Sequence, residues 1–349
     1  MRYKILGKSG LRVAELCLGA MTFGEEWGFG ADKDESKAIF DAYVEAGGNF
    51  VDTANRYTEG TSERHLGEFI HSERDRIVLA TKYSLVTRRG DPNSAGNHRK
   101  SMARALEDSL KRLNTDYIDL YWVHIWDFLT PVEEVMRGLD DLIRAGKILY
   151  IGISDTPAWI VSQANTMAEL RGWTPFIGLQ TEYSLIERTP ERDMLPMART
   201  LDIGVTAWAP LGSGVLTGKY NRPKAHNAEP NRHGEDGPNS RRLSHRNLTI
   251  AAAVQAVADE LGRPASQVAL NWLRQRPGVV IPVIGSRKVS QIKDNLACLE
   301  FTLTESQIQH LDEVSKIELG FPHDFMAMEG IQDITYAGMA ASIDSHRPR

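Results

Sequence analysis

Residues 49–57 read NFVDTANRY, a run that joins a short strand pattern to two titratable side chains. Asn49 to Val51 has the apolar character of a buried strand, and Asp52 follows at its end. Tyr57 comes five residues later. Folding does not require a carboxylate at a strand end, so Asp52 indicates a chemical site.

The same arrangement recurs in the next two apolar runs. Ile77–Thr81 ends at Lys82, and Ile118–Val123 ends at His124. In a parallel barrel the carboxyl ends of neighbouring strands open at one mouth, where catalytic groups collect. We therefore expect Lys82 and His124 to lie at one site together with the acid and the phenol of residues 49–57, Asp52 and Tyr57.

Strand-like runs alternate with helical patterns along the whole chain, which predicts a parallel sheet covered by helices. Eight such units favour a closed barrel over an open sheet. The predicted fold class is therefore α/β, a single (β/α)8 TIM barrel over residues 1–349. The runs predicted as strands are Ala14–Leu18, Asn49–Val51, Ile77–Thr81, Ile118–Val123, Ile148–Ile153, Phe176–Leu179, Ile203–Ala207 and Val279–Ile284.

A threonine followed by a proline marks three predicted helix starts, since threonine can cap the first amides and proline fits the first turn. At Thr130-Pro131 a capping-box glutamate, Glu133, strengthens the signal, and Gly146 is expected to close that helix. The other two pairs are Thr156-Pro157 and Thr189-Pro190.

Four segments stand outside the repeat. Residues 2–13 predict an N-terminal β-hairpin. The loop Thr22–Lys33, the segment 211–247 and the tail 320–349 are long, and the first two are expected at the carboxyl face of the barrel. Long loops are usually either functional or merely variable, and the sequence leaves both explanations open.

The composition is that of an ordinary globular protein, with 349 residues, 42% hydrophobic and 25% charged. A net charge of -5 and a pI near 6.1 argue against a nucleic-acid surface. No apolar run is long enough to cross a membrane, and the first residues do not resemble a signal peptide. The two cysteines, Cys17 and Cys298, form no CxxC, so we expect a reduced, cytoplasmic setting.

The four titratable side chains suit proton transfer to a carbonyl oxygen as a hydride reaches its carbon. A phenol has a pKa near ~10, and a nearby ammonium is expected to lower it. Asp52 would keep the Lys82 amine charged, and His124 could bind the substrate oxygen from the other side. Each residue alone has an ordinary structural explanation, but their joint appearance at consecutive strand ends favours a site.

These motifs together resemble the aldo-keto reductases over almost the full length of the chain. The sequences of the motifs most resemble those of bacterial reductases that are similar to potassium-channel β subunits. The stretches that carry the resemblance are DTANRY at 52–57, TK at 81–82, YIDLYWVH at 117–124, GIS at 152–154, QTEYS at 180–184, WAPL at 208–211, IGSR at 284–287 and DN at 294–295.

The resemblance implies roles for individual positions. Tyr57 would be the general acid, Lys82 and Asp52 would tune it, and His124 would polarise the carbonyl. NADP(H) would be the cofactor, with its nicotinamide carboxamide on Ser154 and Gln180 and its ring against Trp208. The other positions placed around the cofactor are Gly19, Met21, Thr22, Asp52, Asp155, Ala209, Pro210, Leu211, Ser213, Gly214, Lys219, Gly285, Ser286, Arg287, Gln291 and Asn295.

Within that set, the glycine-rich turn at 211–214 and Lys219 would wrap the pyrophosphate, because bare backbone and a cation suit it. Ser286 and Arg287 would meet the adenosine 2′-phosphate, and Gln291 with Asn295 the adenine end. A flexible loop with a solvated lysine, and a solvated loop arginine, are the simpler explanations that stay open.

Two features depart from related sequences or exclude other sites. Asp155 stands where relatives usually carry Asn or Arg, which leaves its role open. No GxGxxG follows the first strand, and no HxH or HExxH occurs, so neither a Rossmann fold nor a metal site is expected. His226, His233 and His245 lie in one polar loop without metal-ligand spacing.

The expected substrate is a small carbonyl compound with an apolar body, bound at Trp27, Tyr57, His124 and Trp126. Phe29, Phe128, Phe321 and Phe325 are further candidates to line that pocket, although ordinary packing explains each equally well.

Besides a carbonyl reductase, as a monomer or a homo-oligomer, two other functions remain open at this point. One is a slow-turnover NADP(H)-binding redox sensor or regulatory subunit, against which His124 argues, since channel-subunit relatives tend to carry Asn there. The other is a barrel hydrolase, which would need a metal or nucleophile site that the sequence lacks.

Overall fold

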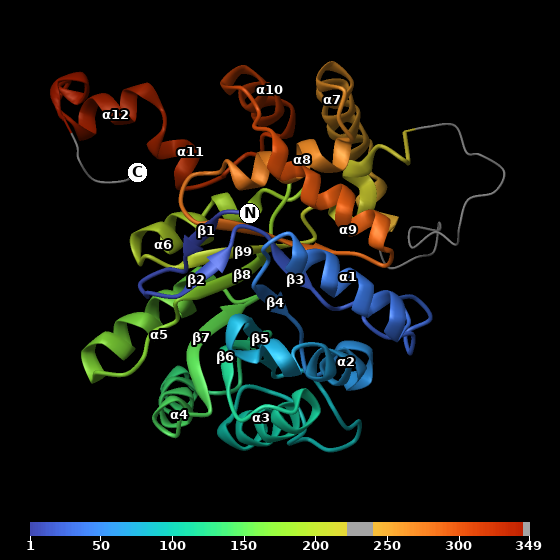
Figure 1. Cartoon of the computed structure of the whole chain (residues 1–349). Coiled ribbons are helices and arrows are strands. Elements are labelled where there is room, and N and C mark those ends of the chain that lie inside the picture. The colour runs from blue at the N-terminus through green and yellow to red at the C-terminus, as the bar shows by residue number, and fades with distance from the viewer. Residues whose placement is uncertain (222–239, 345–349) are drawn as a thin grey trace.

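Eight parallel strands close into a barrel in the computed structural model, which describes residues 1–221 and 240–344 (Figure 1). The strands follow one another around the barrel in the order β10-β3-β4-β5-β6-β7-β8-β9. The predicted (β/α)8 barrel and its eight strand positions are confirmed. The strands are β3 (Cys17–Gly19), β4 (Phe50–Asp52), β5 (Val78–Tyr83), β6 (Ile118–Val123), β7 (Ile148–Ser154), β8 (Gly178–Glu182), β9 (Gly204–Trp208) and β10 (Val280–Gly285).

Helices surround the barrel, as Figure 1 shows, and pack apolar side chains against it. Those that follow the strands are α1 (Lys33–Glu45), α2 (Thr61–Phe69), α3 (Arg99–Leu113), α4 (Val132–Arg144), α5 (Ala158–Arg171), α6 (Met194–Thr200), α7 (His245–Leu261), α8 (Ala265–Arg274), α9 (Val289–Leu296) and α10 (Glu305–Ser315). Short 3-10 turns are η1 (Tyr57–Gly60), η2 (His71–Arg76), η3 (Thr189–Glu191), η4 (Gly212–Thr217), η5 (Ser240–Leu243) and η6 (Ala297–Glu300).

Alternation along the strands divides the apolar residues into two cores. On β6, Tyr121 and Val123 belong to the large core between the strands and the helices, whereas Leu120 and Trp122 belong to a smaller core inside the barrel. Gly152 and Gly178 on the next two strands leave room for the Trp122 ring, since a Cβ on either would overlap it. The inner side of each strand is therefore fixed by packing.

The N-terminal hairpin is confirmed and fills the amino-terminal end of the barrel. Strands β1 (Tyr3–Ile5) and β2 (Arg12–Ala14) pair antiparallel. Leu6 is fully buried in the inner core together with Val13. The Lys8 amide donates to the carbonyl of Asp202 across the barrel end, so the carboxyl end is left as the open mouth.

The predicted threonine caps are wrong by one position. Pro131 and Pro157 are the N-caps of α4 and α5, and neither makes a side-chain cap bond. The Thr130 hydroxyl instead donates to Asp127 at 2.8 Å, and Thr156 donates to the carbonyl of Ser154 at 2.7 Å. Local acceptors before each helix divert the hydroxyl groups that the pattern assigned to the first amides.

At Thr189-Pro190 the pattern marks only the short turn η3, where Thr189 donates to Glu187. The expected end of α4 is confirmed, since Gly146 follows the helix at φ 71°.

The C-terminal tail forms α11 (His323–Met326), α12 (Glu329–Thr335) and η7 (Ala340–Ser342) at the outer edge of the molecule (Figure 1). None of these three elements contains a buried residue. Residues 222–239, with His226 and His233 of the predicted segment 211–247, and residues 345–349 lie outside the described part. Among the described helices, none combines the length and apolar character that crossing a bilayer requires.

Candidate active site

The ends of β4, β5 and β6 bring Asp52, Lys82 and His124 to the mouth of the barrel. Gly19 and Asp52 are paired in neighbouring strands, and Lys82 is paired with Trp122 one strand further on. All these residues occupy positions that alternation directs into the barrel. The strand-end pattern of the sequence thus predicted a real cluster.

Lys82 is the centre of that cluster. It is fully buried and forms an ion pair with Asp52. The same amine donates to the carbonyl of Thr53 at 2.9 Å and to the Tyr57 hydroxyl at 3.2 Å. Gln180 supports the acid from β8, with its amide donating to Asp52 at 3.3 Å. These three acceptors fix the orientation of the ammonium group, with one N–H directed at the phenol oxygen.

Tyr57 projects from a strained turn rather than from a strand. Thr58 and Glu59, which follow it, have φ of 46° and 54°, the left-handed region that a β-branched residue rarely adopts. The Thr58 hydroxyl holds this turn by donating to the carbonyl of Phe23 at 2.7 Å. The same hydroxyl oxygen accepts a hydrogen bond from the Ser62 amide at 3.1 Å. The loop after β3 therefore positions Tyr57.

Burial dominates the acid-base behaviour of the cluster. Burial alone would lower the pKa of Lys82, but the charges of Asp52 and Tyr57 outweigh it and raise that pKa. Burial also raises the pKa of the Tyr57 hydroxyl, and the Lys82 ammonium opposes this rise without reversing it. The expected fall in the Tyr57 pKa is therefore wrong, because the ammonium is shared with Asp52 and water is largely excluded.

His124 lies beside the phenol as a neutral ring. The Tyr57 and His124 ring centroids are 5.7 Å apart, edge to face. Burial, with the Lys82 charge as a second cause, lowers the pKa of His124 well below its ordinary value. Its Nδ1 is buried without a hydrogen-bond partner among the described residues. A neutral imidazole here can donate one hydrogen bond to an oxygen in the mouth.

The next three strand ends carry Ser154, Gln180 and Trp208. Ser154 pairs with Gln180 in neighbouring strands, and both are buried. Asp155 follows Ser154 at φ 42°, and its Oδ1 accepts a hydrogen bond from the Trp208 indole Nε1 at 3.0 Å. Ala209 has φ 50° and directs the chain into the buried Pro210. These predicted positions all lie at one mouth.

The glycine-rich turn after β9 has the bare backbone that the sequence suggested. Gly212, Ser213 and Gly214 all have positive φ, at 55°, 55° and 95°. A Cβ on Gly212 would lie 2.4 Å from the Ile186 side chain, which would have to shift, and the positive φ also favours glycine there. The amine of Lys219 lies 3.3 Å from the Cβ position of Gly214, which brings the predicted lysine to the turn.

The ends of β3 and β10 meet beside the start of α9. Gly19 pairs with Gly285, and the Thr22 hydroxyl donates to the carbonyl of Ser286 at 2.7 Å. The Ser286 hydroxyl is buried without a partner among the described residues. Met21, by contrast, is exposed.

Arg287 lies just before α9, whose N-cap is Lys288, and its amide donates to the Gln291 side chain at 2.9 Å. The Val289 amide donates to Glu35 of α1 at 2.6 Å, so a carboxylate already lies at the helix start where the 2′-phosphate was expected. Asn295 is buried on α9, whereas Gln291 is exposed.

The predicted aromatic residues divide into three groups. Trp27 lies at the mouth, with its ring 6.3 Å from that of Tyr57 and its Nε1 donating to Glu59 at 3.1 Å; Phe29 packs against it. Trp126 is buried in the large core. The exposed candidates are Phe128 before α4 and the mutually packed Phe321 and Phe325 of the tail. Their contact with substrate stays a prediction.

Asn55 and Thr58 are features of the site that the sequence reasoning left without a role. Asn55 is 3% exposed, and neither polar atom of its side chain has a hydrogen-bond partner among the described residues. Asn55 lies within residues 49–57 and Thr58 directly follows Tyr57, so their proximity to Tyr57 in the sequence was the available signal. Within the described part of the chain, no three histidine, cysteine or acidic side chains gather as metal ligands would.

Comparison with known proteins identifies the group to which these features belong. The model of the aldo/keto reductase family matches residues 15–316. The chain is 38% identical to norsolorinic acid reductase of Aspergillus flavus over 335 residues, covering 93% of this chain and 84% of that protein. It is 39% identical to aryl-alcohol dehydrogenase [NADP(+)] of Phanerodontia chrysosporium over 337 residues, covering 90% and 86%. A putative aryl-alcohol dehydrogenase of Saccharomyces cerevisiae is 37% identical over 335 residues, covering 92% and 88%.

Proposed function

Because the chain belongs to the aldo/keto reductase family, we propose that it reduces aldehydes or ketones to alcohols with NADPH, using Tyr57 as the proton donor. The observation that carries this proposal is the Lys82 amine, which is paired with Asp52 and donates to the Tyr57 hydroxyl at 3.2 Å. A buried ammonium fixed on a phenol is suited to stabilising the phenolate that proton donation leaves behind.

The residues around the mouth fit NADP(H). The Ser286 hydroxyl is buried without a partner among the described residues, and an unsatisfied buried hydroxyl is the kind of group that a phosphate oxygen pairs with. The positive φ of Gly212 and Gly214 favours glycine, and two glycines leave the backbone of this turn bare for the pyrophosphate. Ser154 and Gln180 would hold the nicotinamide carboxamide, and Trp208 would lie against the ring.

The reaction divides its work between the bound cofactor and four side chains. When bound, NADPH supplies the hydride that goes to the carbonyl carbon. Tyr57 gives its proton to the carbonyl oxygen, so the products are the alcohol and NADP⁺. Lys82 stabilises the resulting phenolate, and Asp52 keeps Lys82 charged and directed. His124 stays neutral and donates a hydrogen bond to the same oxygen before the proton arrives.

The raised pKa of Tyr57 accords with this role. Burial favours the neutral hydroxyl over the phenolate, and the neutral hydroxyl is the form that can donate a proton. The developing phenolate then meets an ammonium whose own pKa is raised by Asp52. Proton donation is therefore assisted by an interaction that strengthens as the charge develops.

Aromatic aldehydes and the corresponding aryl alcohols are the first substrate class to test. The name of one relative specifies an aryl-alcohol dehydrogenase using NADP⁺. Trp27 offers this chain a half-buried aromatic surface next to Tyr57, with an edge-on ring contact at 6.3 Å. A flat apolar substrate would pack against such a ring.

A slow-turnover NADP(H) sensor or regulatory subunit is the second candidate. It rests on the likeness to bacterial reductases similar to potassium-channel β subunits, whereas the relatives named above are fungal reductases and dehydrogenases. The neutral His124 beside Tyr57 favours the enzyme, because a sensor needs no group to polarise a carbonyl. Oligomeric state and cytoplasmic location stay predictions.

The deciding experiment compares wild type with Tyr57→Phe in NADPH oxidation against aromatic aldehydes, aliphatic aldehydes and diketones. We expect turnover that falls at least about a hundredfold in the variant, since general acid catalysis contributes factors of that order. NADPH affinity should stay within about twofold, because only the hydroxyl is removed. Tight binding with almost no wild-type turnover on every compound would favour the sensor, and equal loss of binding would contradict the role of Tyr57.

A further inference from the structure

Asp155 occupies an unusual position at the end of β7. Its φ of 42° is left-handed, a conformation that aspartate tolerates better than most side chains. Its amide donates to the carbonyl of Gln180 on the neighbouring strand at 3.3 Å. The turn therefore directs the carboxylate across the mouth instead of along the strand.

The carboxylate reaches past the end of β8 to the predicted nicotinamide platform. Its Oδ1 accepts the Trp208 indole N–H at 3.0 Å, although Trp208 ends β9, two strands away. An indole held at its only polar atom has a fixed ring plane. Asp155 is thus a positioning residue for Trp208.

The Asp155 charge is also the least neutralised of the acids at these strand ends. Asp52 is paired with Lys82, and Glu182 is paired with Arg242. In the part of the chain that the structure describes, Asp155 forms no ion pair, and its contact is a neutral indole. Burial raises the pKa of the Asp155 carboxyl, and the Asp155 charge in turn contributes to the raised pKa of Tyr57.

We propose that Asp155 biases the site toward the oxidised cofactor, by placing its negative charge beside the Trp208 platform. This inference rests on the proposed function. NADP⁺ and NADPH carry the same phosphates and differ in ring charge, so the ratio of their two dissociation constants isolates the effect of a charge near the ring. Tighter relative binding of NADP⁺ makes the bound reduced form a stronger hydride donor.

Two kinds of substitution separate the charge from the positioning contact. Asp155→Asn removes the charge, but its Oδ1 can still accept the indole N–H. Asp155→Gly is a second neutral variant that suits the positive φ, in case the amide perturbs the turn. Trp208→Phe keeps the carboxylate and a ring but loses the N–H. Glu133→Gln removes an exposed acid on α4 and serves as the charge control.

Dissociation constants for NADP⁺ and NADPH are measured on each variant by quenching of protein fluorescence, or by calorimetry for Trp208→Phe. We expect both neutral variants to weaken NADP⁺ about five- to tenfold relative to NADPH, the order expected for one partly solvated charge near another. Trp208→Phe should weaken both forms with little change in the ratio, and Glu133→Gln should change neither.

The outcomes separate this inference from the function on which it rests. An unchanged ratio in both neutral variants, with wild type binding both forms, overturns the role of Asp155 and leaves the reductase intact. A ratio that shifts equally in Trp208→Phe also overturns it, because the carboxylate is still present there. Wild type that binds neither form would refute the proposed function and this inference with it.

Discussion

At the scale of single residues, the mouth of the barrel is organised by how each charge is compensated. Lys82 is fully buried, but it has a carboxylate, a carbonyl and a phenol as acceptors. His124 is instead kept neutral by the same burial and the same neighbouring ammonium. One environment therefore produces a charged amine and an uncharged imidazole, which is the combination that carbonyl reduction requires.

His124 should make the fold sensitive to acid. The unfolded ring takes up a proton near its ordinary pKa of ~6.5, whereas the folded ring does not, so stability falls as the pH drops below that value. Wild type should therefore lose unfolding free energy between about pH 8 and about pH 5. We expect His124→Asn to lose less over the same range, with a difference of at most about 2 kcal/mol. Urea unfolding at both pH values checks this, with the exposed His310→Asn as control. An identical loss in wild type and His124→Asn would contradict it.

Arg287 should distinguish the two nicotinamide dinucleotides. Its bidentate guanidinium suits a phosphate monoester, and only NADPH carries one on the adenosine ribose. We expect Arg287→Ala to weaken NADPH about tenfold or more while NADH changes less than about threefold. Dissociation constants for both cofactors check this. Equal weakening of the two would remove the 2′-phosphate assignment.

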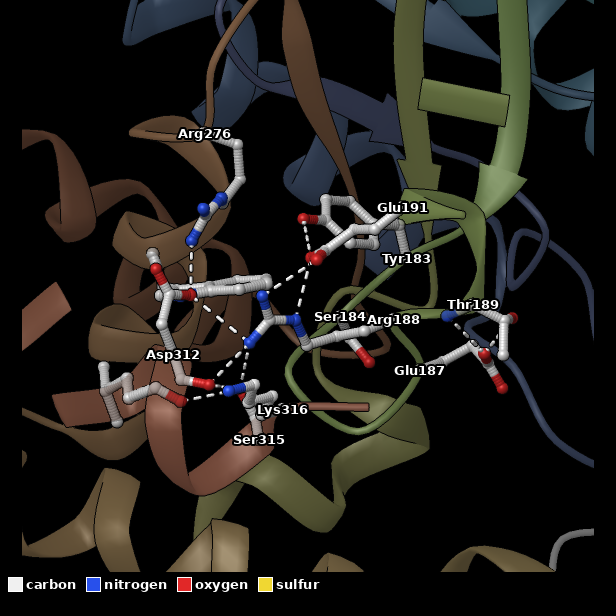
Figure 2. Close-up of polar contacts among 12 residues, drawn as sticks. Tyr183, Ser184, Glu187, Arg188, Thr189, Glu191, Arg276, Asp312, Ser315 and Lys316 are labelled. Atoms are coloured by element: carbon white, nitrogen blue, oxygen red, sulfur yellow. Dashed lines mark hydrogen bonds and ion pairs between the residues drawn. The ribbon is translucent and has the colours of Figure 1, made fainter. Parts of the chain in front are cut away.

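At the scale of elements, a buried arginine ties the segment after β8 to α10. Figure 2 shows Arg188 pointing between Glu191 of η3 and Asp312 with Ser315 of α10. Arg188 donates twice to Glu191, at 2.8 Å each, and to the Ser315 hydroxyl at 2.8 Å. Tyr183 donates to the same Glu191 at 2.6 Å. This cluster anchors the chain that leads away from Gln180 at the mouth.

Arg188→Ala should be strongly destabilising, because it leaves Glu191 without its bidentate partner in a largely buried setting. We expect a loss of about 3–5 kcal/mol in the free energy of unfolding. Arg188→Lys should recover little of it, since an ammonium does not reproduce the planar fork. The exposed pair Lys37–Asp41 is the control, and Lys37→Ala should cost less than about 1 kcal/mol. Similar losses in Arg188→Ala and Lys37→Ala would show that the cluster contributes little.

At the scale of the whole molecule, one large side chain determines how the inside of the barrel is filled. Trp122 is fully buried in the inner core, and in the strand register it is the partner of Lys82. It fits because Gly152 and Gly178 stand opposite, and a Cβ on Gly152 would lie 2.3 Å from the indole. Two glycines inside strands, normally unfavourable there, are thus required by packing.

Gly152→Ala should overpack this inner core. We expect a loss of about 1–3 kcal/mol in unfolding free energy, with rescue when Trp122→Leu makes room for the added methyl. Gly10→Ala is the matched control, since a Cβ there meets nothing within 4 Å. Denaturant unfolding of the four variants checks the coupling. Additive losses in the double variant would rule out a clash with Trp122.

The sequence by itself predicted the barrel, because each strand is a local apolar run that can be recognised without knowledge of its partners. Short apolar runs marked the strands, and Asp52, Lys82 and His124 were predicted to meet at the mouth because each stands at the end of one run. The hairpin and the Gly146 helix end were local signals of the same kind. The threonine caps failed, because the acceptors that captured those hydroxyls belong to the preceding loops.

What only the tertiary structure decided depends on distances between strands and on the exclusion of water. The pKa of Tyr57 rises instead of falling because burial outweighs an ammonium that Asp52 already shares. The contact between Asp155 and Trp208 spans two strands, and the Arg188 cluster joins elements more than a hundred residues apart. Local patterns report which way a side chain points, whereas the balance of charge, burial and partners exists only once the barrel has closed.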